Sequence, residues 1–249
     1  MAALGDRSSI DIERLVSSEA GLRPRSNQHL KAIDQCVYHR FVMWPEADRK
    51  LVSGPHGMPA AEVLEVQRQR MLKAMTEVVT RKGYAGTTIR DLLDQSGLSR
   101  RTFYDLYVDK EDCYLAAFRA VADQLEDRLA AAFESGATAG DRLTLTIESL
   151  AGFCVDEPDA ACAVLVESLA AGQSGRDVRN GLIERIAELL EPALTELRPI
   201  GPSSALVARA TVGGIFELLY GPLARHDAER LRDLAEQIGE LPLVPTAAR

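Results

Sequence analysis

A short turn centred on Gly97 constrains the fold of this 249-residue chain more than any other feature. Residues 88–96 read Thr-Ile-Arg-Asp-Leu-Leu-Asp-Gln-Ser, which predicts a short helix with a threonine cap. Gly97 lies where the chain must reverse, and such a reversal favours a residue that tolerates positive φ. Ser99 is the predicted N-cap of a second short helix, which carries Arg100, Arg101 and an aromatic pair. The pattern predicts a helix-turn-helix.

Residues upstream of this motif predict one further helix, which makes the motif part of a three-helix head. A linker at 53–59 is dense in glycine and proline. Apolar side chains then recur at helical spacing, at Leu64, Met71, Met75, Val78 and Val79. Gly83 is placed to end this helix as a C-terminal cap. We therefore assign residues 59–110 to the head.

The rest of the chain is expected to be helical to its end, which makes the fold all-α. No stretch shows the sustained alternation of a β-strand. Breaks are expected at Pro158, at Gly172, at residues 199–202 and at Gly221-Pro222. The predicted helices span 114–135, 141–154, 159–170, 174–197, 203–220 and 226–238. Residues 111–249 thus form a body of about six helices.

The first 58 residues form an extension of unclear role. A Ser26 cap before a helical apolar pattern predicts a helix that Pro45 ends. Two interpretations stay open. The extension packs on the head, or residues 16–25, which can be laid beside residues 92–101, form a second, degenerate helix-turn-helix.

The charge of the chain is unevenly distributed. The net charge is −8 at pH 7, yet residues 1–110 hold 17 lysines and arginines against 14 acidic residues, whereas residues 111–249 hold 12 against 23. This division suits a DNA-binding head on a body that phosphate repels. A solvated acidic face on any helical protein would also give the acidic excess of residues 111–249. The charge distribution therefore supports the motif without proving it.

Composition argues against several other classes of protein. No run approaches the roughly 20 apolar residues that span a bilayer, and the first residues lack the apolar core of a signal peptide, so we expect a cytoplasmic protein with no membrane partner. The four cysteines form no C-x-x-C pair, which predicts packed thiols and no metal site. The four histidines form no cluster with carboxylates, so we expect no catalytic residues, no enzyme activity and no cofactor.

The motif and its flanks together resemble the TetR family of bacterial transcriptional regulators. The family's order and spacing are matched by residues 83–88 (Gly-Tyr-Ala-Gly-Thr-Thr), 97–99 (Gly-Leu-Ser), 102–104 (Thr-Phe-Tyr), Tyr107 and 109–111 (Asp-Lys-Glu). Leu93 stands where the family usually has a small alanine, and Tyr107 where phenylalanine is usual. The body resembles the family only in its succession of helices.

The resemblance implies that the second helix of the motif enters the major groove of double-stranded DNA. Either Arg100 or Arg101 would pair with a guanine, while Thr88, Tyr104 and Lys110 would bind phosphates. Phe103 is expected in the core. The implied DNA-binding residues are Thr87, Thr88, Ser99, Arg100, Arg101, Thr102, Tyr104 and Lys110.

Family members act as homodimers on near-palindromic sites, and the last two helices would form the dimer interface. The expected interface residues are Leu206, Gly213, Gly214, Leu231, Leu234 and Ile238. Each glycine inside an apolar helix costs about 1 kcal/mol relative to alanine. Close approach of a partner helix would offset that cost.

The resemblance also implies a small-molecule inducer that binds among the middle helices and moves the heads. Candidates for its site are Phe118, Glu148, Phe153, Cys154, Cys162, Leu165, Val166, Glu167 and Phe216. The expected function is that of a homodimeric repressor, which an unidentified inducer releases from its operator. The alternative is a helical interaction scaffold with a degenerate helix-turn-helix, which Leu93 and the acidic net charge keep open.

Overall fold

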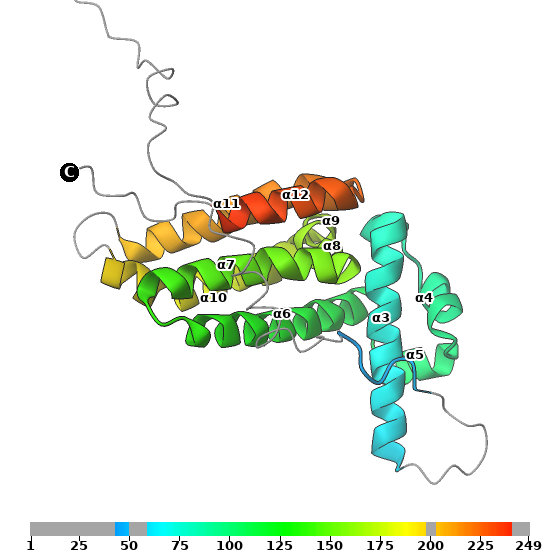
Figure 1. The fold of residues 1–249 in the computed structure, drawn as a ribbon. Coiled ribbons are helices and arrows are strands. Elements are labelled where there is room, and N and C mark those ends of the chain that lie inside the picture. The colour runs from blue at the N-terminus through cyan, green and yellow to red at the C-terminus, as the bar shows by residue number, and fades with distance from the viewer. Residues whose placement is uncertain (1–42, 50–58, 198–202, 241–249) are drawn as a thin grey trace, which may run out of the picture. The chain divides into compact units, whose positions relative to one another are not determined.

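The structure is a computed structural model that describes residues 43–49, 59–197 and 203–240, and these ranges contain helices and no strand, as predicted (Figure 1). The helices are α3 (Ala60–Gly86), α4 (Ile89–Ser96), α5 (Arg100–Leu106), α6 (Lys110–Ser135), α7 (Ala139–Asp156), α8 (Pro158–Leu165), α9 (Glu167–Ala170), α10 (Gly172–Leu197), α11 (Ser204–Ala224) and α12 (Ala228–Gly239). The helix expected before Pro45 lies outside the described residues.

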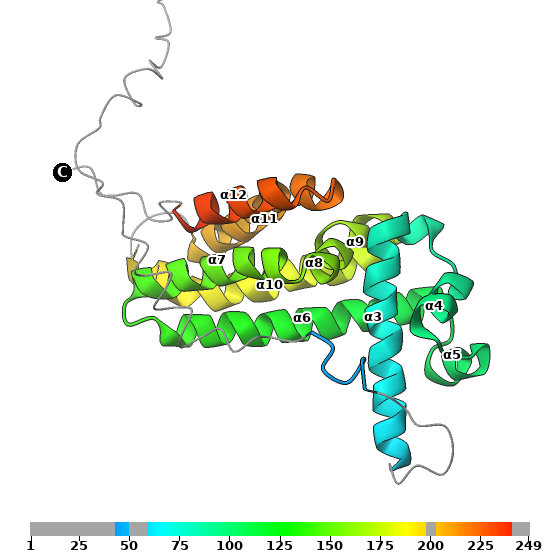
Figure 2. The same ribbon diagram turned by 45° about the vertical axis from the view of Figure 1, so that its right-hand side comes forward.

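Helices α3, α4 and α5 form the predicted head. Met71, Met75, Val78 and Val79 are buried on α3, and α4 and α5 pack on one side of that helix (Figures 1 and 2). The body helices α6, α8 and α9 meet α3 on its other side. Leu64 was expected in the buried stripe, but its side chain is 50% exposed because it lies in the first two turns of α3, far from the body.

Gly83 interrupts α3 where the sequence predicted its end. The residue has φ 73° and ψ 156°, which lies outside the helical region, and the helical chain resumes for one turn as far as Gly86. This positive φ favours glycine, since a side chain at this position would strain the backbone. The break changes the direction of the chain immediately before the helix-turn-helix.

The body consists of long helices that lie side by side. α6, α7 and α10 pack against one another, and α11 and α12 add a further layer on α10 and α7 (Figures 1 and 2). The short helices α8 and α9 lie where this bundle meets α3. Since α6 starts at Lys110, the predicted boundary between head and body coincides with the start of a helix.

Two predicted helix boundaries in the body are wrong. The helix expected over 159–170 is two helices, because the chain leaves regular helical geometry at Val166. The break expected at Gly221-Pro222 does not occur, and α11 continues to Ala224. Pro222 lies in the last turn of α11, where its missing N–H removes the bond to the carbonyl four residues earlier, and the helix ends two residues later.

The buried core of the body includes three cysteines. Cys113, Cys154 and Cys162 are buried free thiols, and burial raises the pKa of Cys154 to about 12 and that of Cys162 to about 11. These thiols therefore remain protonated at neutral pH and pack as small apolar groups, as predicted. Cys36 lies outside the described residues.

Residues 43–49, called the 43–49 segment below, pack against α3. Met43, Trp44 and Ala47 are buried. Glu46 N–H donates to Oε1 of Gln69 at 2.8 Å, and Arg70 Nε donates to the carbonyl of Ala47 at 2.9 Å. This part of the extension therefore packs on the head, which was the first of the two interpretations. The residues of the supposed second motif lie outside the described residues.

Candidate DNA-binding site

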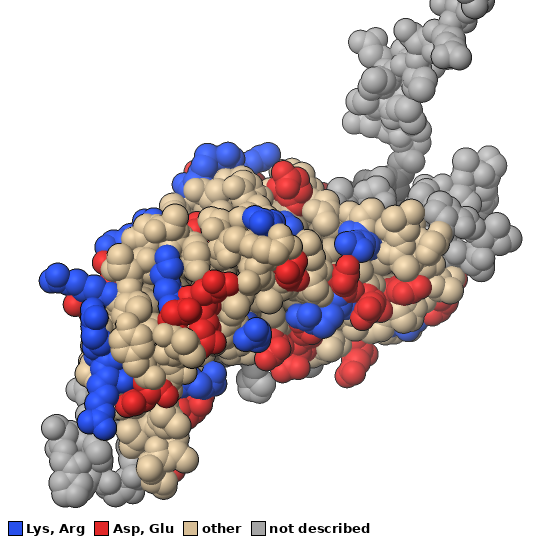
Figure 3. Space-filling view, turned by 180° about the vertical axis from the view of Figure 1, so that it is seen from behind, with Lys and Arg blue, Asp and Glu red and all other residues tan. Residues whose placement is uncertain are grey.

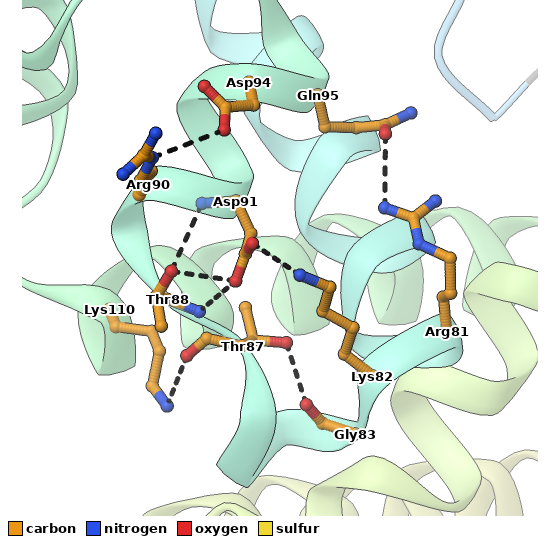
Figure 4. A network of polar contacts seen from close by, with 10 residues as sticks. All are labelled: Arg81, Lys82, Gly83, Thr87, Thr88, Arg90, Asp91, Asp94, Gln95 and Lys110. Carbon is orange, nitrogen blue, oxygen red and sulfur yellow. Dashed lines mark hydrogen bonds and ion pairs between the residues drawn. The ribbon is translucent and has the colours of Figure 1, made fainter.

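The N-terminus of α4 is fixed by a closed network of hydrogen bonds (Figure 4). The Thr88 hydroxyl accepts the backbone N–H of Asp91 at 3.3 Å, and the Asp91 carboxylate accepts the backbone N–H of Thr88 at 3.0 Å. This reciprocal pair is a capping box. Lys82 on α3 adds an ion pair to Asp91 Oδ1 at 2.5 Å, which connects the first helix of the head to the second.

The environment of Asp91 strongly favours its charged form. Hydrogen bonds from Lys82 and then from Thr88 lower its pKa from 3.8 to about 2. The carboxylate also faces the positive end of the α4 dipole. Asp91 is therefore ionised over the physiological pH range and holds Thr88 in place.

The turn between α4 and α5 has the predicted geometry. Gly97 has φ 68° and lies in the left-handed region, and its N–H donates to the carbonyl of Leu93. Ser99 is the N-cap of α5, and its hydroxyl accepts the N–H of Thr102 at 3.1 Å. The Ser99 and Thr102 hydroxyls also hydrogen-bond each other at 2.9 Å. Leu93 is only half-buried, and Leu92 is the residue that α4 buries fully.

The outer face of α5 exposes the side chains that the sequence assigned to DNA. Arg100 and Ser99 are exposed, Arg101 has 92% of its side chain exposed, and Tyr104 is half-exposed. Arg101 faces Asp105 at 3.9 Å, a contact between exposed groups that costs little to break. Phe103 is fully buried, as predicted, and its ring supports Tyr104 edge-on at 5.3 Å.

Arg90 is an exposed arginine beside this face that the sequence reasoning did not select. It lies two residues after Thr88 on α4, its side chain is 85% exposed, and its contact with Asp94 is long at 3.8 Å. The sequence could have indicated Arg90, because it stands in the first turn of a helix whose threonine cap was predicted. In Figure 3, lysines and arginines gather along the outer edge of the head, whereas the body shows acidic and basic side chains interspersed.

Two residues of the predicted DNA-binding set point inward. Thr87 is buried, and its hydroxyl donates to the carbonyl of Gly83 at 2.8 Å, so it closes α3 and does not cap α4. Lys110 donates to the carbonyls of Tyr84 at 2.9 Å and Thr87 at 3.1 Å. Its ammonium also lies 4.2 Å from the centre of the Tyr84 ring. Lys110 thus stabilises the carbonyl end of α3, and we remove both residues from the set.

The same end of α3 is attached to the body by Glu167. Its Oε2 accepts the backbone N–H of Tyr84 at 2.6 Å, directly after the break at Gly83. The Tyr84 ring packs edge-on against Tyr114 of α6 at 4.9 Å, and the Tyr114 hydroxyl donates to the carbonyl of Ala163 at 2.6 Å. Glu167 was predicted as a ligand anchor, but its carboxylate serves this joint.

The other predicted ligand residues do not surround an open pocket. Six of them are packed in the core with 2% exposure or less: Phe118, Phe153, Cys154, Cys162, Leu165 and Phe216. Val166 is half-buried at the junction of α8 and α9. Glu148 lies beside Gly239, at the contact of α7 with α12. A ligand at these positions would need the bundle to open.

An open cavity of about 220 Å³ lies elsewhere, where α3 meets the ends of α7, α8, α11 and α12. Its lining includes the apolar residues Leu223 and Leu231 and the polar residues Thr80, Asp159 and His226. None of the predicted ligand residues lines it. Its residues come from five separate helices, so no local sequence pattern indicates it.

The predicted dimer residues divide into two groups. On α12, Leu231, Leu234 and Ile238 are buried within the same chain, where α12 packs on α7 and α11, so they are core residues. On α11, Leu206 is 64% exposed, and a Cβ added at Gly213 or Gly214 would meet no atom within 4 Å.

The composition of α11 agrees with this exposure. Of the helices in the described ranges, α11 is the one long and apolar enough to cross a membrane, and 39% of its apolar window is buried within the chain. An apolar helix with an exposed small-residue face also suits packing against another protein helix.

Comparison with known proteins assigns the head to a family. The family model described as "Bacterial regulatory proteins, tetR family" matches residues 71–117, from the middle of α3 into α6. The Uncharacterized HTH-type transcriptional regulator YezE of Bacillus subtilis (strain 168) is 39% identical over 64 residues, which cover 26% of this chain and 31% of that protein.

Two further similarities extend into the body. The Fatty acid metabolism regulator protein of Bacillus subtilis (strain 168) is 23% identical over 127 residues, which cover 51% of this chain and 66% of that protein. The crystal structure of the transcriptional regulator FadR from Bacillus subtilis in complex with stearoyl-CoA has a TM-score of 0.62 at 22% identity, covering 72% of this chain and 98% of that chain. The head thus matches the TetR family of bacterial regulatory proteins over residues 71–117, and the chain shares its helical fold with the FadR structure.

Proposed function

We propose that the chain is a homodimeric repressor that reads a near-palindromic operator through α5 and releases it when a small molecule binds the body. The observation that carries this proposal is the exposed face of α5, where Arg100 and Arg101 directly follow the Ser99 cap. Within the described part of the chain, Arg100 has no hydrogen-bond or ion-pair partner. The ion pair of Arg101 with Asp105 is long, at 3.9 Å. Both guanidinium groups are thus available to guanine O6 and N7.

The neighbouring groups suit contacts to the DNA backbone. Tyr104 is exposed and braced by Phe103, while Thr88 and Arg90 lie at the start of α4, whose N-terminal dipole favours phosphate. Contacts of this kind set the register of the helix on the duplex, and the two arginines then read the bases. We therefore assign DNA binding to Thr88, Arg90, Ser99, Arg100, Arg101, Thr102 and Tyr104, on a head that spans 59–110.

A dimer through α11 is the second part of the proposal. Leu206 and Leu218 are exposed apolar residues on either side of the Gly213-Gly214 pair, and the space above both glycines is open. A partner helix can approach closely at such a site. Two heads held by one dimer would read the two halves of a near-palindromic operator.

Selection of bound duplexes from a random DNA pool, at two salt concentrations, tests the proposal. We expect one near-palindromic sequence to be enriched and its affinity to fall steeply as salt rises. Arg101→Ala should weaken binding to that site by roughly 10- to 100-fold and relax specificity at one base pair of each half-site. Arg119→Ala removes an exposed arginine of the body as the matched control. Equal losses in the two variants would remove Arg101 from the residues that read bases.

The effector class is proposed from the relatives and from the body core. The FadR structure contains stearoyl-CoA, and the predicted ligand positions here are mostly aliphatic or aromatic, which suits an acyl chain that enters when the bundle opens. We propose a long-chain acyl-CoA as the inducer. Titrating the protein–operator complex with acyl-CoAs of increasing chain length should release the DNA, whereas CoA alone and short-chain acyl-CoAs should not. If no acyl-CoA releases the DNA, the proposed effector is rejected, while the proposal of an operator-binding regulator stands.

A further inference from the structure

The 43–49 segment makes a dense set of contacts with the first half of α3. The two hydrogen bonds at Gln69 and Arg70 described above are joined by a second bond from Arg70 to the carbonyl of Arg49. Lys73 Nζ contacts both carboxylate oxygens of Asp48, at 2.9 and 3.1 Å. Basic side chains of α3 that would otherwise face solvent thus hold this segment.

The same segment is also bound to the body. Gln124 of α6 donates its side-chain N–H to the carbonyl of Met43 at 3.0 Å. The backbone of Met43 also hydrogen-bonds the carboxylate of Glu157, which lies between α7 and α8. Met43 is therefore fixed to two elements of the body, while residues 46–49 are fixed to α3.

These contacts give α3 a second attachment to the body. The first is in the C-terminal part of α3, where α3 packs on α6, α8 and α9, the Tyr84 N–H donates to Glu167 and the Thr80 hydroxyl donates to the Asp159 carbonyl. The 43–49 segment acts on Gln69, Arg70 and Lys73, three to four turns earlier. A helix attached at one end can pivot about that point, whereas a helix attached at two separated points cannot turn without breaking one of them.

We propose that the 43–49 segment is a strap that restrains the orientation of the head relative to the body. The proposal rests on the proposed function, since the orientation of the head decides whether α5 fits its half-site. A loosened strap lets the head adopt more orientations, so the fraction of protein molecules whose heads can bind the operator falls. Apparent affinity falls by the same fraction. Loss of a single strap hydrogen bond should weaken operator binding roughly fivefold.

The chain contains a natural probe of the strap, because Trp44 is its single tryptophan and is buried. We expect the full-length protein to show blue-shifted Trp44 emission that acrylamide quenches poorly. Gln124→Ala, which cuts the body contact, and Arg70→Ala, which cuts the head contact, should both increase quenching. The matched controls are Asp127→Ala, an exposed residue on α6, and Arg68→Ala, whose partner Glu65 lies on α3 itself. Both controls should leave quenching unchanged.

Two further measurements connect the strap to the head. In the DNA-free protein, hydrogen exchange at the amides of residues 84–88 should be faster in both strap variants than in their controls. Their affinity for the selected operator should fall about fivefold relative to the controls. The strap is rejected if Trp44 is freely quenched in the wild type, or if the variants free Trp44 without changing exchange or affinity. A wild type that selects no operator rejects the proposed function instead, and quenching and exchange still decide the strap.

Discussion

Tyr107 is the residue of the head whose polar group is least well satisfied. Its side chain is 7% exposed, its hydroxyl has no hydrogen-bond partner within the described part of the chain, and burial raises its pKa. A buried hydroxyl without a partner costs about 1–3 kcal/mol in desolvation. Tyr107→Phe should therefore raise the free energy of unfolding, by about 1 kcal/mol in urea denaturation. Tyr104→Phe, at an exposed position, should leave it unchanged, and a loss of stability in Tyr107→Phe would contradict the prediction.

Asp91 gives the head a dependence on acid pH. Its pKa is lowered in the folded state, from 3.8 to about 2, so its stabilising contribution is complete above about pH 4 and disappears as pH falls towards 2. Asp91→Asn should thus lower the Tm at pH 7, and the difference from wild type should shrink between pH 4 and pH 2. Thermal melts across this range test the prediction, with Asp94→Asn, an exposed carboxylate on the same helix, as control. A difference independent of pH would show that the charge of Asp91 does not matter.

Single residues also show how far the sequence could predict the site. Gly97 and Ser99 were correctly assigned because their roles depend on local backbone geometry, which the sequence around them specifies. The contacts of Thr87 and Lys110 were not predicted because both side chains bind carbonyls at the end of α3, which come within reach only through the break at Gly83. A polar side chain near a helix start has a partner that only tertiary structure determines.

At the scale of elements, α11 has the face best suited to a second copy of the chain. Gly214 is exposed and has open space above it, so Gly214→Leu should leave the isolated subunit folded, and the better helix propensity of leucine adds about 1 kcal/mol. The same side chain would hold a partner helix away. Sedimentation velocity should show a shift from dimer to monomer with unchanged helicity by circular dichroism. Ala131→Leu, an equivalent change on the exposed face of α6, should not alter sedimentation.

The helices themselves were largely predictable, but their packing partners were not. Apolar periodicity and the breaks near Pro158 and Gly172 located the body helices to within a few residues, except that α8 and α9 were predicted as one helix. The stripe at Leu231, Leu234 and Ile238 was assigned to the dimer interface, yet it is buried inside its own chain. Periodicity predicts that a face is covered and does not say by what. The open cavity and the contacts of the 43–49 segment involve residues far apart in sequence, so no local pattern predicts them.

At the scale of the whole molecule, the head and body are expected to unfold together because α3 is bound to the body near its C-terminal end and, through the strap, at its middle. Glu167→Ala would leave the N–H of Tyr84 without its charged acceptor, at a cost of about 1.5–3 kcal/mol. We expect a lower Tm but a single transition, since the strap contact at Gln124 remains.

Combining Glu167→Ala with Gln124→Ala removes one contact from each attachment and gives the sharpest test of this arrangement. If both attachments restrain the rotation of α3 relative to the body, the double variant should lose both restraints. Hydrogen exchange at residues 84–88 should then rise by more than the product of the two single effects. Pairing Glu167→Ala with Asp127→Ala gives the matched control. Single effects that simply multiply would mean that each contact stabilises only its own neighbourhood, and that the two attachments do not act together on the head.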